Sequence, residues 1–183
     1  MQTPSNLTLH YFDVKDEQNI SCIHVKATDI MKRTPVHFIV VLDTSGSMDM
    51  EGKLKHVAQS IHFMLDFFTD NDLLSIITFS ENATVHVRQE YTTSDRKSYI
   101  RQLVSGLTAE TYTNMSDALV SAEECIIPNT DIRSEQYKQG ILLLTDGIAN
   151  RGLIQTESLN ELVNRLIQEN HRGAITLSTV GYG

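Results

Sequence analysis

The sequence predicts an α/β domain with a doubly wound, mainly parallel sheet and helices on both faces. Short apolar runs that suit buried strands, such as 38–42 and 141–145, alternate with longer segments of helical periodicity. Strands that alternate with helices pair in parallel through right-handed crossovers. A length of 183 residues is enough for one such domain with a sizeable core. We therefore expect a Rossmann-like sheet whose strand ends share one edge.

The N-terminal residues are predicted to form a short β-hairpin ahead of this domain. Segments 7–13 and 19–27 have β-type composition on either side of the polar stretch DEQN. We accordingly divide the chain into a hairpin extension and linker, 1–34, and a main domain, 35–183.

The first half of the main domain is predicted to begin with a buried strand, 38–42, and to continue with another, 73–79. Segment 83–91 alternates apolar and polar residues, and only SEN separates it from the preceding strand. This pattern indicates one antiparallel edge strand. A helix over about 51–68 is expected from apolar residues at steps of three and four, namely Leu54, Val57, Ala58, Ile61, Met64, Leu65 and Phe68.

The second half follows the same alternation. Ser94 is expected to cap a helix over 95–105. Another helix begins near Met115 or Ser116 and ends before Pro128. A third buried strand is expected at 141–145 and a last strand at 174–180. Between them we expect a helix that is capped by Thr156 and ends at 170–173.

Composition excludes several function classes. The net charge is −8 and the pI is near 5.3, which argues against a nucleic-acid-binding surface. No apolar run approaches the roughly 20 residues of a membrane helix, and the first residues lack the features of a signal peptide. Cys22 and Cys125 have no metal or redox spacing, so we expect buried thiols and a cytoplasmic location.

Oxygen-bearing side chains follow two of the buried strands and precede one helix. Asp43, Ser45 and Ser47 follow the strand 38–42, Thr113 precedes the helix near Met115, and Asp146 follows 141–145. In a doubly wound sheet these loops meet at the carboxyl edge, where ligands bind. A set of carboxylates and hydroxyls suits Mg²⁺ or Mn²⁺ better than zinc. Any one of these residues alone could instead be a turn residue or a helix cap.

Three short motifs occur in this chain: D-x-S-x-S at 43–47, T-N at 113–114 and T-D-G at 145–147. Together they resemble the metal-ion-dependent adhesion site (MIDAS) of the von Willebrand factor type A (VWA) family. The resemblance extends from Val36 to Gly183. It implies Mg²⁺, with Mn²⁺ or Ca²⁺ as alternatives, and one metal position left for an Asp or Glu carboxylate of a protein partner. The implied ligands are Ser45 and Ser47 directly, Asp43 and Asp146 mainly through water, and Thr113 by either route.

Two carboxylates against one divalent cation predict a nearly neutral site that does not repel an incoming carboxylate. We expect Asp43 to lie at the rim and not in the core, so that Asp43→Ala leaves the domain folded. The chain has Thr111 and Tyr112 where family members often have glycines, which places Tyr112 at the ligand-binding rim. Glu110 could fill the open metal position from within the chain or remain a solvated loop residue. The family's final helix and last strand have no counterpart here.

These features favour a divalent-cation-dependent protein–protein interaction module that is similar to cell-adhesion domains, intracellular and not an enzyme. A metal-dependent hydrolase is one alternative, but Ser45 stands where haloacid-dehalogenase phosphatases need Asp. Segment 46–53 has the wrong glycine spacing for a phosphate loop, and no G-x-S-x-G occurs. A structural domain that keeps the motif without metal is the other alternative.

Overall fold

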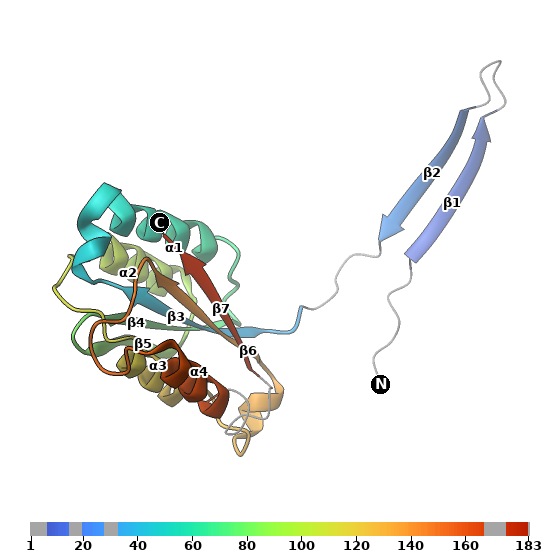
Figure 1. Cartoon of the computed structure of the whole chain (residues 1–183). Helices are drawn as coiled ribbons and strands as arrows, with labels where there is room; N and C mark the ends of the chain where they lie inside the picture. Colours follow the sequence, from blue (N-terminus) through green and yellow to red (C-terminus); the bar gives the residue numbers. More distant parts are fainter. Residues whose placement is uncertain (1–6, 15–19, 28–32, 167–174, 183) are drawn as a thin grey trace. The chain divides into compact units, whose positions relative to one another are not determined.

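The computed structural model describes residues 7–14, 20–27, 33–166 and 175–182 (Figure 1). Contacts divide the chain into two units, Met1–Arg33 and Thr34–Gly183. In the first unit, β1 (Leu7–Val14) and β2 (Ile20–Ala27) pair antiparallel, which confirms the predicted hairpin.

The second unit contains a five-stranded sheet in the order β5-β4-β3-β6-β7. β3 pairs in parallel with β4 and β6, and β6 pairs in parallel with β7, whereas β5 is antiparallel to β4. The predicted fold class is therefore confirmed. The strands are β3 (Val36–Asp43), β4 (Leu73–Phe79), β5 (Ala83–Tyr91), β6 (Lys138–Thr145) and β7 (Ile175–Gly181).

Helices cover both faces of the sheet because successive side chains of the central strands point to opposite sides. One face of β3 packs Val40 and Leu42 against α1 (Lys53–Leu65) and α2 (Ser94–Ser105). The other face packs Ile39 and Val41 against α3 (Met115–Glu124). α4 (Thr156–Asn164) lies beside α3, where Leu162 packs against Leu119 (Figure 1). The predicted apolar stripe of the first helix lies in the first of these cores.

The predicted boundaries differ at several ends. The helix expected over 51–68 is α1, which begins at Lys53, because Glu51 and Gly52 have left-handed backbone angles, φ 55° and 68°, and which ends at Leu65. A 3₁₀ segment, η1 (Gly46–Gly52), precedes it. β6 starts three residues before the predicted 141, since Lys138 already pairs with Val36 on the central strand. A second short 3₁₀ segment, η2 (Ile132–Glu135), precedes β6.

The helix caps also lie one residue earlier than predicted. Thr93 and not Ser94 caps α2, with its hydroxyl accepting from the Arg96 amide, and Gln155 and not Thr156 precedes α4. The predicted end of the last helix at 170–173 and the first residue of the strand 174–180 lie outside the described residues. Cys22 is also among the residues whose side chains are not described, whereas Cys125 is a buried free thiol, as predicted.

A buried polar network crosses the amino-terminal part of the sheet. The Gln139 side chain pairs with both backbone groups of Ile127, so its Oε1 is an acceptor, and His37 Nδ1 donates to it over 3.0 Å. Ser75 Oγ accepts from the Gln89 amide and lies 3.0 Å from His37 Nε2. Burial, more than any other factor, lowers the pKa of His37.

Candidate metal centre

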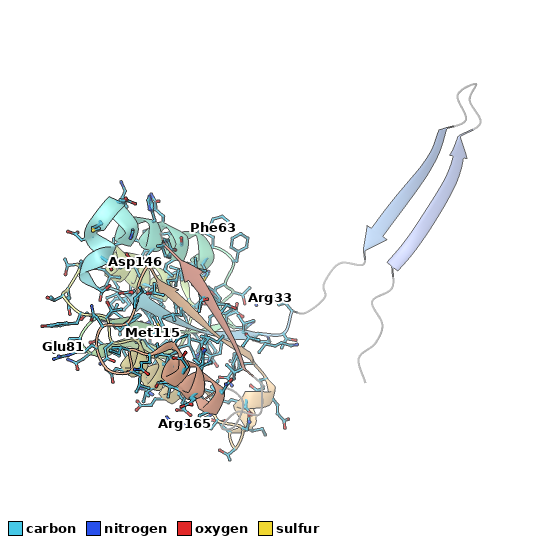
Figure 2. All side chains as sticks on the ribbon, in the orientation of Figure 1. Arg33, Phe63, Glu81, Met115, Asp146 and Arg165 are labelled. Atoms are coloured by element: carbon cyan, nitrogen blue, oxygen red, sulfur yellow. The ribbon has the colours of Figure 1, made fainter. Side chains whose placement is uncertain are left out.

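The three predicted loops converge at the carboxyl edge of the sheet, around Gly147. A methyl carbon placed on Gly147 would lie 3.8 Å from Ser47 Oγ, 3.9 Å from Asp43 Oδ2 and 4.0 Å from Thr113 Cγ2. Asp146, labelled in Figure 2, is the neighbouring residue at the end of β6. Residues that are as much as 103 positions apart in sequence, from 43 to 146, therefore surround one small space. The fold brings all five predicted ligands together.

The two serines have the spacing of adjacent ligands of a small divalent cation. Ser47 Oγ donates to Asp146 Oδ1 over 2.7 Å, and Ser45 Oγ lies 3.2 Å from Ser47 Oγ. Because the proton of Ser47 goes to Asp146, Ser45 is the donor between the two serines. Neighbouring oxygens in a Mg²⁺ octahedron, each about 2.1 Å from the ion, lie about 3 Å apart. The distance between the two serine oxygens is thus close to that of adjacent ligands in such an octahedron.

Asp43 is a fully buried anchor of the loop, with no exposed surface. Its Oδ1 accepts from the Ser45 amide over 2.8 Å, and its Oδ2 accepts from Thr145 Oγ1 over 2.5 Å. The expectation that Asp43 lies at the rim is therefore wrong. Because a buried carboxylate holds both Ser45 and the end of β6, its removal leaves two donors unpaired and destabilises the domain.

Lys53 is a member of the site that the sequence reasoning missed. Its Nζ lies 2.5 Å from Asp146 Oδ2, and the two side chains are only 15% and 1% exposed. Lys53 is the first residue of α1 and lies ten positions after Asp43. It is not part of the apolar stripe that predicts this helix. The predicted charge balance, two carboxylates against one divalent cation, left this ammonium group out.

Thr113 is held by its backbone. Its amide donates to Asn150 Oδ1 over 2.8 Å, and its carbonyl accepts from the Asn150 amide over 3.0 Å. Thr113 is only 3% exposed. Asn150, in the loop after β6, is thus a second positioning residue that sequence reasoning missed, and it ties this loop to the loop before α3.

The two predicted rim residues have partners of their own. Tyr112 is exposed, and the guanidinium carbon of Arg151 lies over its ring, 4.9 Å from the ring centre. Arg151 in turn forms an ion pair with Glu81 over 2.6 Å. Glu81 and Asp146 lie on the same side of the domain in Figure 2. The Glu110 carboxylate accepts from the Ser80 hydroxyl, and the Glu110 amide donates to Thr44 O. These interactions do not test the predictions that Tyr112 lies at the ligand-binding rim and that Glu110 could fill the open metal position.

Gly46 is needed because two loops touch there. A methyl carbon on Gly46 would lie 3.0 Å from the backbone carbonyl of Glu110, closer than side chains normally approach. The absence of a side chain therefore lets the D-x-S-x-S loop pack directly on the loop before α3.

Ser47 is the exposed member of the five predicted ligands. Asp43, Ser45 and Thr113 are buried, whereas Ser47 is exposed. Among the described residues no group of three or more His, Cys, Asp or Glu could hold a metal ion, so a cation here would depend on hydroxyl oxygens. A cavity of about 640 Å³ between α1 and the segment after α2 includes none of the five predicted ligands in its lining.

The sequence model of the von Willebrand factor type A domain matches residues 38–148, more than half of the chain. The chain belongs to this family. The chain is 31% identical over 173 residues to bovine inter-alpha-trypsin inhibitor heavy chain H4. This alignment covers 88% of the chain and 17% of the relative. The chain is also 26% identical over 166 residues to mouse heavy chain H3, with 88% and 18% covered. The chain thus spans less than a fifth of these two relatives.

Solved structures show the same fold. A von Willebrand factor type A protein from Catenulispora acidiphila aligns with TM-score 0.68 at 21% identity, over 89% of this chain and 35% of that one. Manganese-loaded TRAP from Plasmodium vivax aligns with TM-score 0.62 at 21% identity, over 82% and 59%. Within the described part of the VWA chain, no helix has the length and apolar character needed to cross a membrane.

Proposed function

We propose that this VWA domain is a divalent-cation-dependent binding module that holds an acidic residue of a protein partner. The observation that carries the proposal is the convergence of Asp43, Ser45, Ser47, Thr113 and Asp146, with the two serine oxygens 3.2 Å apart. Mg²⁺ is the proposed ion, with Mn²⁺ or Ca²⁺ as alternatives. The manganese-loaded state of the similar TRAP structure supports a cation in this fold.

The residues divide into those that would hold the ion and those that prepare them. Ser45 and Ser47 would supply hydroxyl oxygens, and Asp146 accepts the hydrogen bond of the Ser47 hydroxyl, which leaves the lone pairs of that oxygen available to a cation. Asp43 fixes the loop through the Ser45 amide. The bound ion would supply an electrophilic centre with a free position, and neutral hydroxyl ligands keep it attractive to a carboxylate.

Catalysis is not part of the proposal. Three histidines contact hydroxyls among the described residues: His37 with Ser75, His86 with Thr78 and His62 with Ser105. His62 Nε2 donates to the carbonyl of Arg101, so this nitrogen cannot accept the proton of Ser105. Both His37 and Ser75 are completely buried, so a substrate cannot reach them. Thr78 is only 8% exposed and pairs with His86 within the β4–β5 ladder. The His37 and His86 pairs are better explained as stabilising contacts of the sheet, and the His62 pair as a contact between α1 and α2.

The ion pair of Lys53 with Asp146 favours one alternative, a structural domain in which the ammonium takes the place of the metal. The charge of the site speaks against a complete replacement. Asp43 and Asp146 both have buried carboxylates, and Lys53 forms an ion pair with Asp146 alone of the two. One negative charge is left, and a buried uncompensated charge is costly.

A capture experiment tests the proposed function. The immobilised chain is incubated with an extract of the source organism in Mg²⁺ or in chelator, next to Ser45→Ala in Mg²⁺. We expect the same proteins to bind wild type in Mg²⁺ and to be absent from the other two samples. A set of partners that is retained both in chelator and by Ser45→Ala would contradict the proposal. The predicted cytoplasmic location can be checked with the captured partners.

A further inference from the structure

The Lys53–Asp146 ion pair suggests a role for the protein's own cation in the site. The Lys53 ammonium lies 2.5 Å from Asp146 Oδ2, while Ser47 binds the other oxygen, Oδ1, over 2.7 Å. The two contacts use different oxygens of one carboxylate. Asp146 can therefore keep Lys53 on one oxygen while its other oxygen faces the serines.

Lys53 is held in this place by more than attraction to one carboxylate. It is the first residue of α1, and the helix is fixed to the sheet by Val57 and Ile61, which are 0% and 1% exposed. The lysine side chain is 15% exposed and its partner 1% exposed, so solvent screens the pair weakly. The ammonium is thus a fixed charge next to the proposed ion.

We infer that Lys53 sets the charge of the site so that an anionic ligand is required to complete it. This inference rests on the proposed function. Asp43 and Asp146 carry two negative charges and Lys53 one positive charge, so the protein groups alone leave one negative charge. A divalent ion changes this to one positive charge, and one carboxylate from a partner restores neutrality.

Lys53 accordingly acts in opposite directions on the two binding events. Its positive charge repels the divalent ion and weakens metal binding, but it attracts the carboxylate that follows. Without Lys53, the ion alone would neutralise both aspartates, and the carboxylate would bring an excess negative charge. Lys53 is therefore a specificity-determining residue that favours the complex of ion and anionic ligand over the ion alone.

The test compares wild type with Lys53→Met, Lys53→Arg and Lys55→Met. Lys55 lies two residues further along the same helix and is exposed, so its replacement removes one charge without touching the site. Mn²⁺ affinity is measured by calorimetry. Acetate affinity for the Mn²⁺-loaded protein is measured by the loss of water-proton relaxation enhancement. Circular dichroism confirms that each variant is folded.

We expect Lys53→Met to bind Mn²⁺ about five- to tenfold more tightly and acetate about as much more weakly, as for one partly screened charge nearby. Lys53→Arg, which keeps the charge, and Lys55→Met should stay close to wild type. A purely structural role would lower both affinities together, and that outcome, or no change in either, overturns the inference. If neither wild type nor Lys53→Met binds Mn²⁺, the proposed function itself fails.

Discussion

Thr145→Val probes the hydrogen bonds that fix the buried aspartate of the site. Thr145 Oγ1 donates to Asp43 Oδ2 over 2.5 Å and accepts from the Gly147 amide over 3.1 Å. Valine has nearly the same shape and suits the end of a strand, so the substitution removes only the hydroxyl. A hydrogen bond to a charged group contributes about 1.5–3 kcal/mol, and a neutral one about 0.5–1.5 kcal/mol. We expect the free energy of unfolding to fall by about 2–4 kcal/mol.

The assay is urea unfolding followed by circular dichroism, in chelator so that no bound ion compensates for the lost donor. Thr84→Val is the matched control, because Thr84 is exposed on the edge strand β5 and its replacement should change stability by less than about 0.5 kcal/mol. In an Asp43→Asn background, the cost of Thr145→Val should shrink, since the charged acceptor is gone. A Thr145→Val protein as stable as wild type, or an unchanged cost beside Asn, would refute the assigned role of Asp43.

Three further predictions follow from the site and the sheet. Gly147→Ala should fold normally, because its methyl would make ordinary contacts of 3.8–4.0 Å, but it should bind Mn²⁺ more weakly than the control Gly181→Ala. The methyl of Gly181→Ala would meet no atom within 4 Å. Equal Mn²⁺ affinities of the two variants in calorimetry would argue against an ion at Gly147. Gly46→Ala should lose about 1–3 kcal/mol in urea unfolding, because its methyl would press on the Glu110 carbonyl at 3.0 Å; a neutral effect would mean that the loops yield freely. Burial lowers the folded-state pKa of His37 below the value of 6.5 in an unfolded chain. As the pH falls, the unfolded state therefore binds a proton before the folded state does. The free energy of unfolding should decrease below about pH 6.5, by up to about 1.4 kcal/mol per pH unit. In denaturant titrations, His37→Gln should reduce this dependence of stability on pH, whereas His56→Gln, at an exposed position, should not. An unchanged pH dependence in His37→Gln would contradict its assignment to His37.

The fold and the convergence of the five residues predicted as ligands could be derived from the sequence because their signals are local. A buried strand such as 73–79 is a continuous apolar run, and the sheet topology then brings the loops after such strands to one edge. The family resemblance added the order of D-x-S-x-S, T-N and T-D-G. No local pattern, however, says how deep a residue at a strand end lies. The sequence pattern therefore predicts Asp43 at the rim, whereas the packing of Thr145 and Ser45 around it buries it completely.

Pairs formed across the fold could not be predicted in the same way. Lys53 and Asp146 are 93 positions apart in sequence, and a lysine at the start of a helix normally faces solvent. Asn150 reaches Thr113 from another loop, with no motif to mark it. The split between η1 and α1 depends on positive φ at Glu51 and Gly52, which the apolar periodicity of the helix does not encode.

Calorimetric titration of the chain with Mg²⁺ and Mn²⁺ tests the central claim most directly. Ser45→Ala removes one of two hydroxyl oxygens that lie 3.2 Å apart, and Ser98→Ala, on an exposed position of α2, is the matched control. We predict one binding site in wild type and Ser98→Ala, and loss of that binding in a folded Ser45→Ala. Heat of binding that persists unchanged in Ser45→Ala, or its absence from wild type, would contradict the proposed metal centre.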